Sequence, residues 1–233
     1  MSAAPAPTPD PRDRLVLVLD LDSLPAARAL ARRLAPWFGT VKIGYELYAA
    51  AGPGAFDALH DDGFGVFADL KLYDIPTTVE RAARAIGRHG VELLNVHAVG
   101  GVPMLRAGIA GLTEGARDRG HEPPVALAVT VLTSEPDATL VGERLQIAHD
   151  AGCDGVVCAA AEAAAARALD LAPMVPGIRL TDSDTNDQAR VATPADALRN
   201  GAAWLLLGRA VTAAPDPEAA AARVTHEAAA ALQ

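Results

Sequence analysis

The chain has 233 residues, is 51% hydrophobic and carries a formal net charge of −9. A composition this apolar can bury a sizeable core at this length, which excludes an intrinsically disordered protein. The acidic balance, without a clustered basic stripe, excludes non-specific nucleic-acid binding, but it allows one anionic small molecule in a local positive pocket.

The first segment, residues 1–13, is rich in proline and alanine and lacks the apolar core of a signal peptide. We expect it to form a disordered tail ahead of a single domain at 14–233. No apolar run in the chain approaches the roughly 18 residues that a membrane span requires. These features predict a cytoplasmic protein.

Eight short apolar runs, rich in Val, Ile and Leu, are typical of strands that are buried on both faces. They lie at 15–20, 40–44, 66–71, 93–98, 125–132, 155–159, 174–178 and 204–208. Each is followed by a helix-like stretch, at 24–36, 53–62, 77–89, 102–119, 139–151, 160–169, 194–200 and 216–232. Regular alternation implies parallel strands joined by crossover helices, so the sequence predicts an α/β fold with a single (β/α)8 TIM barrel.

Two of these helices have recognisable start signals. Thr77, directly after Pro76, is expected to cap a helix together with Glu80 in a capping box. Thr193 is expected to cap the helix that has Pro194 at its first position.

Polar residues at the carboxyl ends of the strands are candidate site residues, because barrels of this kind place their chemistry there. The chain has 20 basic residues; only Lys42 and Lys71 are lysines, and both lie at strand ends. Arginine serves solubility and surface ion pairs elsewhere, which indicates a more specific role for the two lysines. The polar residues at strand ends are Asp20, Lys42, Asp69, Lys71, His97, Thr133, Arg179, Gly208 and Arg209.

Asp69 and Lys71 are two residues apart on a strand, so their side chains should point the same way. A lysine ammonium can give up a proton, whereas an arginine guanidinium effectively cannot. Lys71 is therefore a candidate proton donor. The alternative for this pair is a buried structural ion pair.

The other strand-end residues also have structural alternatives. Lys42 could extend to solvent at the barrel rim. Asp20 could cap the following helix, alongside Asp22 or Ser23. His97, as a lone histidine, is more often a hydrogen-bonded core residue.

The two cysteines, Cys153 and Cys158, lack the second pair that a zinc site needs. We expect both to be ordinary buried thiols.

The last two strands indicate a phosphate site, because barrels often bind phosphate there. The backbone N–H of Gly208 and the guanidinium of Arg209 could hold the phosphate oxygens. The polar segment 180–192 is long for a barrel loop and is expected to be a lid or a solvated loop. Gln188 in this loop could reach a bound phosphate.

Taken together, these motifs closely resemble those of the orotidine 5′-phosphate decarboxylase family over residues 15–217. The most specific motif is Asp-x-Lys-x-x-Asp-Ile-Pro-x-Thr, which the chain matches without exception from Asp69 to Thr78. The motifs "VKIG", "NVHA", "TVLTS", "PGIR" and "GR" also occur in the family's order. One departure is Val99, where a small residue such as serine is expected; it concerns a local loop contact rather than the chemistry.

The resemblance implies an enzyme that converts orotidine 5′-phosphate to UMP and CO2, the last step of UMP biosynthesis, without a metal ion or cofactor. It implies an alternating charge array of Lys42, Asp69, Lys71 and Asp74, with protonation of the C6 carbanion by Lys71. It also implies a homodimer in which Asp74 and Thr78 reach the partner's site.

The same resemblance implies the substrate contacts. Asp20 and Lys42 would contact the ribose, and Thr133 would lie near the pyrimidine. The phosphate would be held by Gln188, Arg209 and the Gly208 backbone, with Arg179 at its edge. The full expected set is Asp20, Lys42, Asp69, Ile75, Thr78, Thr133, Arg179, Gln188, Gly208 and Arg209.

Two other functions remain open from the sequence. Sugar-phosphate enzymes on the same scaffold, such as 3-keto-gulonate-phosphate decarboxylase and hexulose-phosphate synthase, share an Asp-x-Lys-x-x-Asp core. They use Mg²⁺ and carry a glutamate where this chain has Lys42. A non-catalytic nucleotide-binding protein would need the phosphate site but not the intact charge array.

Overall fold

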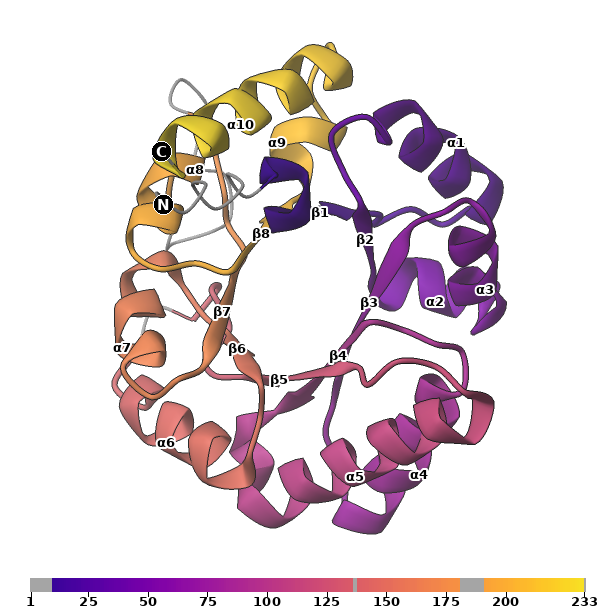
Figure 1. The fold of residues 1–233 in the computed structure, drawn as a ribbon, viewed down its shortest axis with the longest axis vertical. Helices are drawn as coiled ribbons and strands as arrows, with labels where there is room; N and C mark the ends of the chain where they lie inside the picture. The colour runs from indigo at the N-terminus through magenta and orange to yellow at the C-terminus, as the bar shows by residue number, and fades with distance from the viewer. Residues whose placement is uncertain (1–9, 136–137, 181–190, 233) are drawn as a thin grey trace, which may run out of the picture.

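A computed structural model of the chain describes residues 10–135, 138–180 and 191–232. Eight parallel strands pair in chain order, and β1 pairs with β8 to close a barrel, as Figure 1 shows. The predicted TIM barrel is thereby confirmed. The strands are β1 (Leu15–Val18), β2 (Thr40–Ile43), β3 (Gly65–Leu72), β4 (Leu93–His97), β5 (Val125–Val129), β6 (Gly155–Val157), β7 (Ala172–Val175) and β8 (Trp204–Leu207).

Helices surround the strands, and Figure 1 shows them as an outer ring. The eight predicted helices are all present: α1 (Leu24–Leu34), α3 (Gly54–Asp61), α4 (Pro76–Gly87), α5 (Gly101–Arg119), α6 (Val141–Ala151), α7 (Ala163–Arg167), α8 (Pro194–Arg199) and α10 (Pro217–Ala231). Short additional elements are α2 (Tyr45–Ala51), α9 (Arg209–Thr212) and the 3-10 helices η1 (Pro11–Arg14), η2 (Ala98–Gly100) and η3 (Ala160–Glu162).

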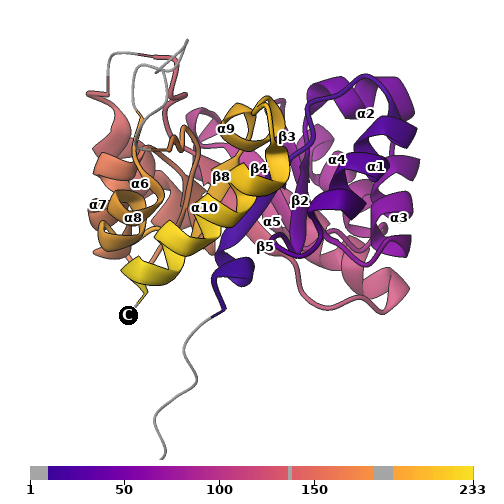
Figure 2. The same cartoon turned by 90° about the horizontal axis from the view of Figure 1, so that it is seen from above.

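The two ends of the barrel differ in what they carry. Helix η1 precedes β1 at the amino-terminal end, and α9 follows β8 at the opposite end, as the side view in Figure 2 shows. The disordered tail expected at 1–13 stays a prediction for residues 1–9, which lie outside the described ones. Pro11–Arg14, at its end, form the 3-10 helix η1. None of the helices in the described ranges is long and apolar enough to cross a membrane.

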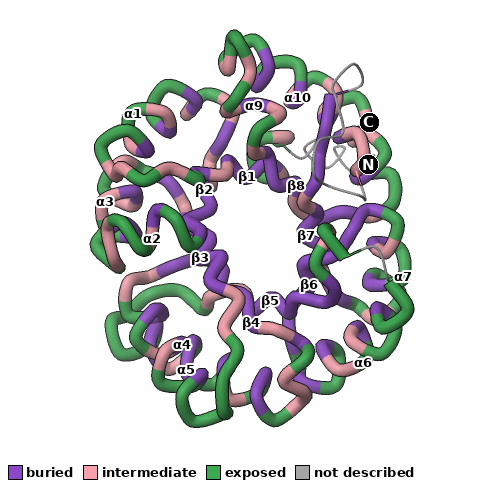
Figure 3. The backbone as a smooth tube through the Cα atoms, turned by 180° about the vertical axis from the view of Figure 1, so that it is seen from behind, coloured by how far each residue is buried: buried purple, intermediate pink, exposed green. Residues whose placement is uncertain are grey.

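The core has an inner and an outer part, and Figure 3 shows the buried strands inside a ring of helices with exposed outer faces. On β1, Val16 belongs to the cluster that includes Phe67 and Met174, whereas Leu15 and Leu17 pack in the cluster that includes α1. Burying a side chain such as Phe67 contributes roughly 1.5–3 kcal/mol. This packing inside the barrel helps to fix the positions of the strands and therefore of the residues at their carboxyl ends.

The helix starts agree with the sequence in one case and differ in the other. Thr193 caps α8, and its Oγ1 accepts a hydrogen bond from the Asp196 N–H at 3.1 Å. The Thr77 cap was wrong: Pro76 is the first residue of α4, and Ile75 is its N-cap without a side-chain hydrogen bond. Proline has the fixed φ and the missing N–H that suit this first position, so the helix begins before Thr77.

Both cysteines are buried, as expected. Burial, and to a smaller extent the charge of Asp154, raises the pKa of the Cys153 thiol to about 12. Cys153 is therefore a thiol and not a thiolate at neutral pH.

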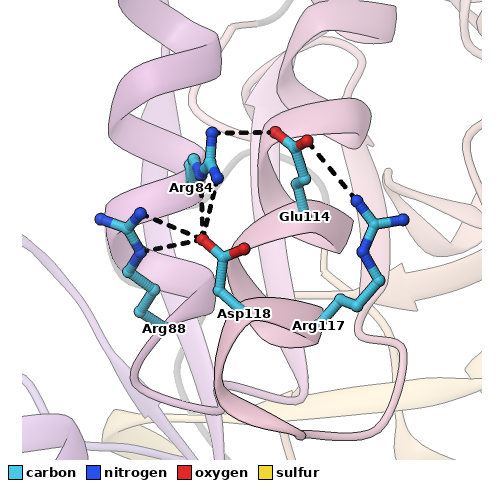
Figure 4. Close-up of polar contacts among 5 residues, drawn as sticks. All are labelled: Arg84, Arg88, Glu114, Arg117 and Asp118. Atoms are coloured by element: carbon cyan, nitrogen blue, oxygen red, sulfur yellow. Dashed lines mark hydrogen bonds and ion pairs between the residues drawn. The ribbon is translucent and has the colours of Figure 1, made fainter.

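Helices α4 and α5 pack against each other at unusually close range. A methyl group at Gly115 of α5 would overlap the backbone carbonyl oxygen of Arg84 on α4. The same two helices are also joined by a cluster of ion pairs, drawn in Figure 4, which we call the surface charge cluster. It consists of Arg84, Arg88, Glu114, Arg117 and Asp118.

Candidate active site

A cavity of about 450 Å³ lies at the carboxyl ends of the strands. It brings together eight of the residues predicted from the sequence, from six of the eight strand ends. These residues are Asp20, Lys42, Asp69, Lys71, Thr133, Arg179, Gly208 and Arg209. Their proximity follows from the barrel, and the roles expected for them stay predictions.

The centre of the cavity is one carboxylate between two ammonium groups. Asp69 Oδ1 lies 2.6 Å from Lys71 Nζ, and Asp69 Oδ2 lies 3.1 Å from Lys42 Nζ. The Lys42 ammonium also donates a hydrogen bond to Asp20 Oδ1 at 2.9 Å. Four charges of alternating sign therefore run from Asp20 to Lys71, and we call them the buried array.

The two inner members of the buried array, Lys42 and Asp69, stay ionised although they are removed from water. Lys42 is 6% exposed and Asp69 is 7% exposed. Burial works to raise the pKa of Asp69, but the charges of Lys42 and Lys71 outweigh it, so this pKa is lowered. Burial likewise works to lower the pKa of Lys42, and the charges of Asp69 and Asp20 reverse the sign, so this pKa is raised.

The alternatives for Lys42 and Asp20 are excluded by this geometry. Lys42 is paired with two carboxylates and does not extend to solvent at the rim. Asp20 contacts Lys42, and Ser23 caps α1 through a hydrogen bond from the Ala26 N–H.

Gly44, which ends the "VKIG" motif, leaves the space that the Lys42 side chain needs. A Cβ atom at position 44 would lie 2.6 Å from Lys42 Nζ and 3.1 Å from Asp20 Oδ1. Any larger residue would therefore push the ammonium from its two carboxylates.

Lys71 reaches Asp69 by a backbone geometry that the sequence did not predict. The pairing of β3 with β4 shifts register, so that Asp69, Leu70 and Lys71 lie opposite Asn95 alone. Lys71 has φ +43°, which is uncommon for a residue with a side chain. Its N–H donates to Asn95 Oδ1 at 2.7 Å. The site thus depends on a β-bulge.

Asn95 and Thr212 were missed from the sequence. Asn95 lies between apolar neighbours in the middle of the run "LLNVHA", and this contrast was the available signal. Thr212 lines the cavity from the end of α9, where no motif indicated it.

The far side of the cavity is lined by β7 and β8 and the residues after them. Arg179 is buried, and its Nη1 donates to the Ile178 carbonyl at 3.0 Å. Its backbone N–H donates to the Ala192 carbonyl at 2.9 Å, which holds the two ends of the long segment together beside the cavity. Gln188, the predicted phosphate contact, lies outside the described residues, as does most of the loop expected to be a lid.

Asp74, Ile75 and Thr78 do not line the cavity. All three are exposed: Asp74 and Ile75 lie between β3 and α4, Thr78 lies in the first turn of α4, and Ile75 is 67% exposed. Asp74 Oδ1 accepts a hydrogen bond from the Ile75 N–H at 2.6 Å. Within one chain, the fourth member of the expected charge array is therefore separate from the other three.

His97 also lies outside the main cavity, and it lines a neighbouring one of about 290 Å³. Its ring meets the Tyr73 ring edge-on at a centroid distance of 6.4 Å. The expectation of a hydrogen-bonded core histidine was wrong for Nδ1, which is buried without a partner among the residues that the structure describes. Burial, Lys71 and Arg144 together lower the pKa of His97.

Two remaining features concern metals and the one sequence departure. Within the described ranges, no group of three or more His, Cys, Asp or Glu side chains is arranged to hold a metal ion. Val99 lies in η2, is exposed and is not part of the cavity lining.

Comparisons with known proteins agree with this geometry. Residues 13–224 match the model of the "Orotidine 5′-phosphate decarboxylase / HUMPS family". The chain is 44% identical to an orotidine 5′-phosphate decarboxylase of Moorella thermoacetica, with 89% of each chain covered. It is 45% identical to that of Alkalilimnicola ehrlichii, covering 88% of this chain and 91% of the relative.

Among solved structures, the chain is similar to an orotidine 5′-phosphate decarboxylase from Lactobacillus acidophilus. The TM-score is 0.76 at 33% identity, and the match covers 93% of this chain and 99% of the other. The chain belongs to the orotidine 5′-phosphate decarboxylase / HUMPS family.

Proposed function

We propose that the chain decarboxylates orotidine 5′-phosphate to UMP and CO2, the last step of UMP biosynthesis, without a metal ion or cofactor. The observation that carries the proposal is the buried array, in which Asp69 contacts the ammonium groups of Lys42 and Lys71 inside one cavity. The relatives named for this activity add support.

Substrate binding would use two sides of the cavity. On the side of β7 and β8, Arg179, Arg209 and the Gly208 N–H would hold the 5′-phosphate, joined by Gln188 from outside the described residues. On the side of β1 and β2, Asp20 and Lys42 would contact the ribose hydroxyls. Thr133 would lie near the pyrimidine. These contacts orient the substrate carboxylate toward Asp69 and Lys71.

The chemical step then follows from fixed charge. The bond between C6 and the carboxylate carbon breaks, CO2 leaves, and the electron pair stays on C6. The Lys71 ammonium stabilises this carbanion and transfers a proton to it, and the neutral amine regains its proton from solvent. Because the ammonium attracts the transition state more strongly than the ground state, it lowers the barrier.

Asp69 would lower the barrier in a different way, by raising the free energy of the bound substrate. Two like charges about 4 Å apart repel by about 4 kcal/mol at an effective dielectric constant of about 20. Departure of CO2 removes this repulsion. Slow reactions can require a barrier reduction of roughly 20 kcal/mol, so the remainder would come from the carbanion's ion pair and from binding energy at the remote phosphate.

Lys42 favours this reaction over that of the Mg²⁺-dependent sugar-phosphate enzymes. Its ammonium lies 2.9 Å from Asp20 Oδ1 and 3.1 Å from Asp69 Oδ2, and so it neutralises the carboxylates that a divalent cation would need. The test is the loss of orotidine 5′-phosphate absorbance on adding EDTA-treated protein. Rapid loss with UMP as the product supports the proposal. No loss with orotidine 5′-phosphate, but turnover of a sugar phosphate with Mg²⁺, contradicts it.

We further propose that the chain acts as a homodimer in which Asp74 and Thr78 complete the partner's site, with Ile75 contacting the substrate there. Asp74 is exposed outside its own cavity, and Tyr73 and Ile75 beside it are apolar and more than 60% exposed. Adjacent exposed apolar side chains of this size commonly mark an interaction surface.

Mixing two inactive variants tests this shared site. Asp74→Asn and Lys71→Ala should each be inactive alone. After subunit exchange, a mixture of equal parts should regain about a quarter of the wild-type rate, because half the symmetric dimers are mixed and each has one intact site. No recovery, with exchange demonstrated by differently tagged chains, contradicts the proposal.

A further inference from the structure

We propose that Asn95 is a positioning residue that holds Lys71 and Asp69 in their reactive arrangement. This inference rests on the proposed decarboxylation and adds a residue that makes no contact with the substrate in that scheme. It follows from three contacts around the bulge in β3.

The first observation is the register between β3 and β4. Ala68 pairs with Leu94 and Leu72 pairs with Val96, so three residues of β3 lie opposite the single residue Asn95. A bulge leaves backbone groups without their ladder partners. At this bulge the Lys71 N–H and the Leu70 carbonyl are both hydrogen-bonded to side chains.

The second observation is that Asn95 uses both ends of its amide. Its Oδ1 accepts the Lys71 N–H at 2.7 Å, and its Nδ2 donates to Asp69 Oδ1 at 2.6 Å. A flipped amide would place its NH2 group against the Lys71 N–H and its oxygen against a carboxylate, so these partners fix one orientation. Asn95 is 0% exposed, so water cannot replace either bond.

The third observation concerns the other side of the same peptide unit. The Tyr45 hydroxyl donates to the Leu70 carbonyl at 2.8 Å. The C=O and the N–H of the Leu70–Lys71 peptide are thus both held by side chains from neighbouring elements. Lys71 keeps φ +43°, and such a conformation persists only where the surroundings over-determine it.

These contacts connect Asn95 to the position of the Lys71 ammonium. Asp69 Oδ1 accepts from Asn95 Nδ2 and from Lys71 Nζ, both at 2.6 Å. Without the amide, the Asp69 carboxylate can rotate and the Lys71 backbone can return to an extended conformation. Either movement takes the proton donor away from the place where the C6 carbanion forms, while the phosphate and ribose contacts remain.

The kinetic test compares Asn95→Ala with the matched control Thr130→Val. Thr130 is also 0% exposed, and its substitution by valine removes one buried hydrogen bond, from its Oγ1 to the Val157 carbonyl at 3.0 Å, whereas Asn95→Ala removes two. We expect Asn95→Ala to lower kcat by about 100-fold or more, as misplacement of a reacting group does. The UMP affinity of Asn95→Ala should stay within about threefold of wild type. The kcat of Thr130→Val should also stay within about threefold of wild type. Equal losses in both variants, or weakened UMP binding without a fall in kcat, would overturn the inference.

Asn95→Asp gives a pH signature that a purely structural role lacks. The introduced carboxyl group would lie beside Asp69, and two carboxylates this close share a proton. At pH 5 the shared proton can replace the lost amide donor, so we expect Asn95→Asp to be at least about ten times faster than Asn95→Ala, with the advantage declining as the pH rises. An Asn95→Asp variant as slow as Asn95→Ala at pH 5 contradicts the inference.

Tyr45→Phe and a structural readout complete the test. Tyr45→Phe removes one hydrogen bond from the same peptide, and we expect it to slow kcat by about tenfold, less than Asn95→Ala. A crystal structure of Asn95→Ala should show Lys71 outside the positive-φ region and its ammonium withdrawn from Asp69. Because this readout needs no turnover, it separates failure of the inference from failure of the proposed function. An unchanged Lys71 in that crystal structure would overturn the inference.

Discussion

The buried array and the surface charge cluster are two ion-pair networks with similar distances in opposite surroundings. In the surface charge cluster, Asp118 Oδ2 lies 3.0 Å from both Arg84 Nη2 and Arg88 Nη2 (Figure 4). In the buried array, Asp69 lies 2.6 Å and 3.1 Å from its two lysines. The cations differ in kind: the surface cluster uses arginine, and the buried array contains both lysines of the chain.

The comparison shows that distance alone does not indicate what an ion pair does. Exposed pairs are screened by water and salt and contribute little to stability. Buried charges carry a large desolvation cost that only their partners offset. Arginine suits the surface because its planar fork binds one carboxylate through two nitrogens, whereas a lysine ammonium, unlike a guanidinium, can transfer its proton to a strong base such as a carbanion.

The largest expected effect is at Lys71. Lys71→Ala should reduce kcat by at least about a thousandfold, because a proton donor and an electrostatic stabiliser are lost together. Lys71→Arg keeps the charge and should be nearly as slow, since a guanidinium does not give up its proton. Stopped assays with orotidine 5′-phosphate measure both rates, and UMP titration confirms an intact site. A variant that retains a tenth of the wild-type rate would remove Lys71 from the donor role.

Asp69→Asn should destabilise the protein in a pH-dependent way. Removing the carboxylate leaves the Lys42 and Lys71 ammonium groups without the anion that they share. Losing one member of a buried ion pair typically costs about 3 kcal/mol or more. The pKa of Asp69 is lowered from 3.8 on folding. Its contribution to stability is therefore present above that pH and is lost as the pH falls through the lowered value.

Urea unfolding of wild type and Asp69→Asn at pH 7 and near pH 3 checks this prediction. The difference in the free energy of unfolding should be largest at pH 7 and smaller at low pH. A difference that grows as the pH falls would mean that Asp69 is not held as an anion by the two lysines.

Gly115→Ala should also destabilise the protein, but without affecting the site. The added methyl group would overlap the Arg84 carbonyl, so α4 and α5 must move apart. Overpacking of this kind costs typically about 1–3 kcal/mol. Urea unfolding at pH 7 measures the loss, and kcat should equal that of wild type. An unchanged free energy of unfolding would show that the two helices adjust without cost.

The smallest effect is expected for Asp118→Asn in the surface charge cluster. The melting temperature should shift by less than about 2 °C, because exposed ion pairs contribute little. The shift should shrink further at 1 M salt, and kcat should not change. A large, salt-independent shift would place this cluster in the same class as the buried array.

The sequence predicted the barrel and most of the cavity because both depend on local signals. Apolar runs and their spacing mark strands, and parallel closure brings Asp20 and Arg209 together from opposite ends of the chain. The bulge at Lys71 was not predictable in this way, because it depends on Asn95 of a neighbouring strand. The Thr77 cap failed because Pro76 competes for the same helix start. Asp74 lies outside its own cavity, a position that one chain alone does not explain.

The restriction of lysine to the buried array has a practical consequence for spectroscopy. Reductive methylation with carbon-13 labels primary amines, and apart from the α-amino group this chain offers only Lys42 and Lys71. The NMR spectrum of the labelled protein would therefore contain side-chain signals from the cavity and from nowhere else. Lys71, the more accessible of the two, would react first, and ligand binding could be followed at the nitrogen that we propose as the proton donor.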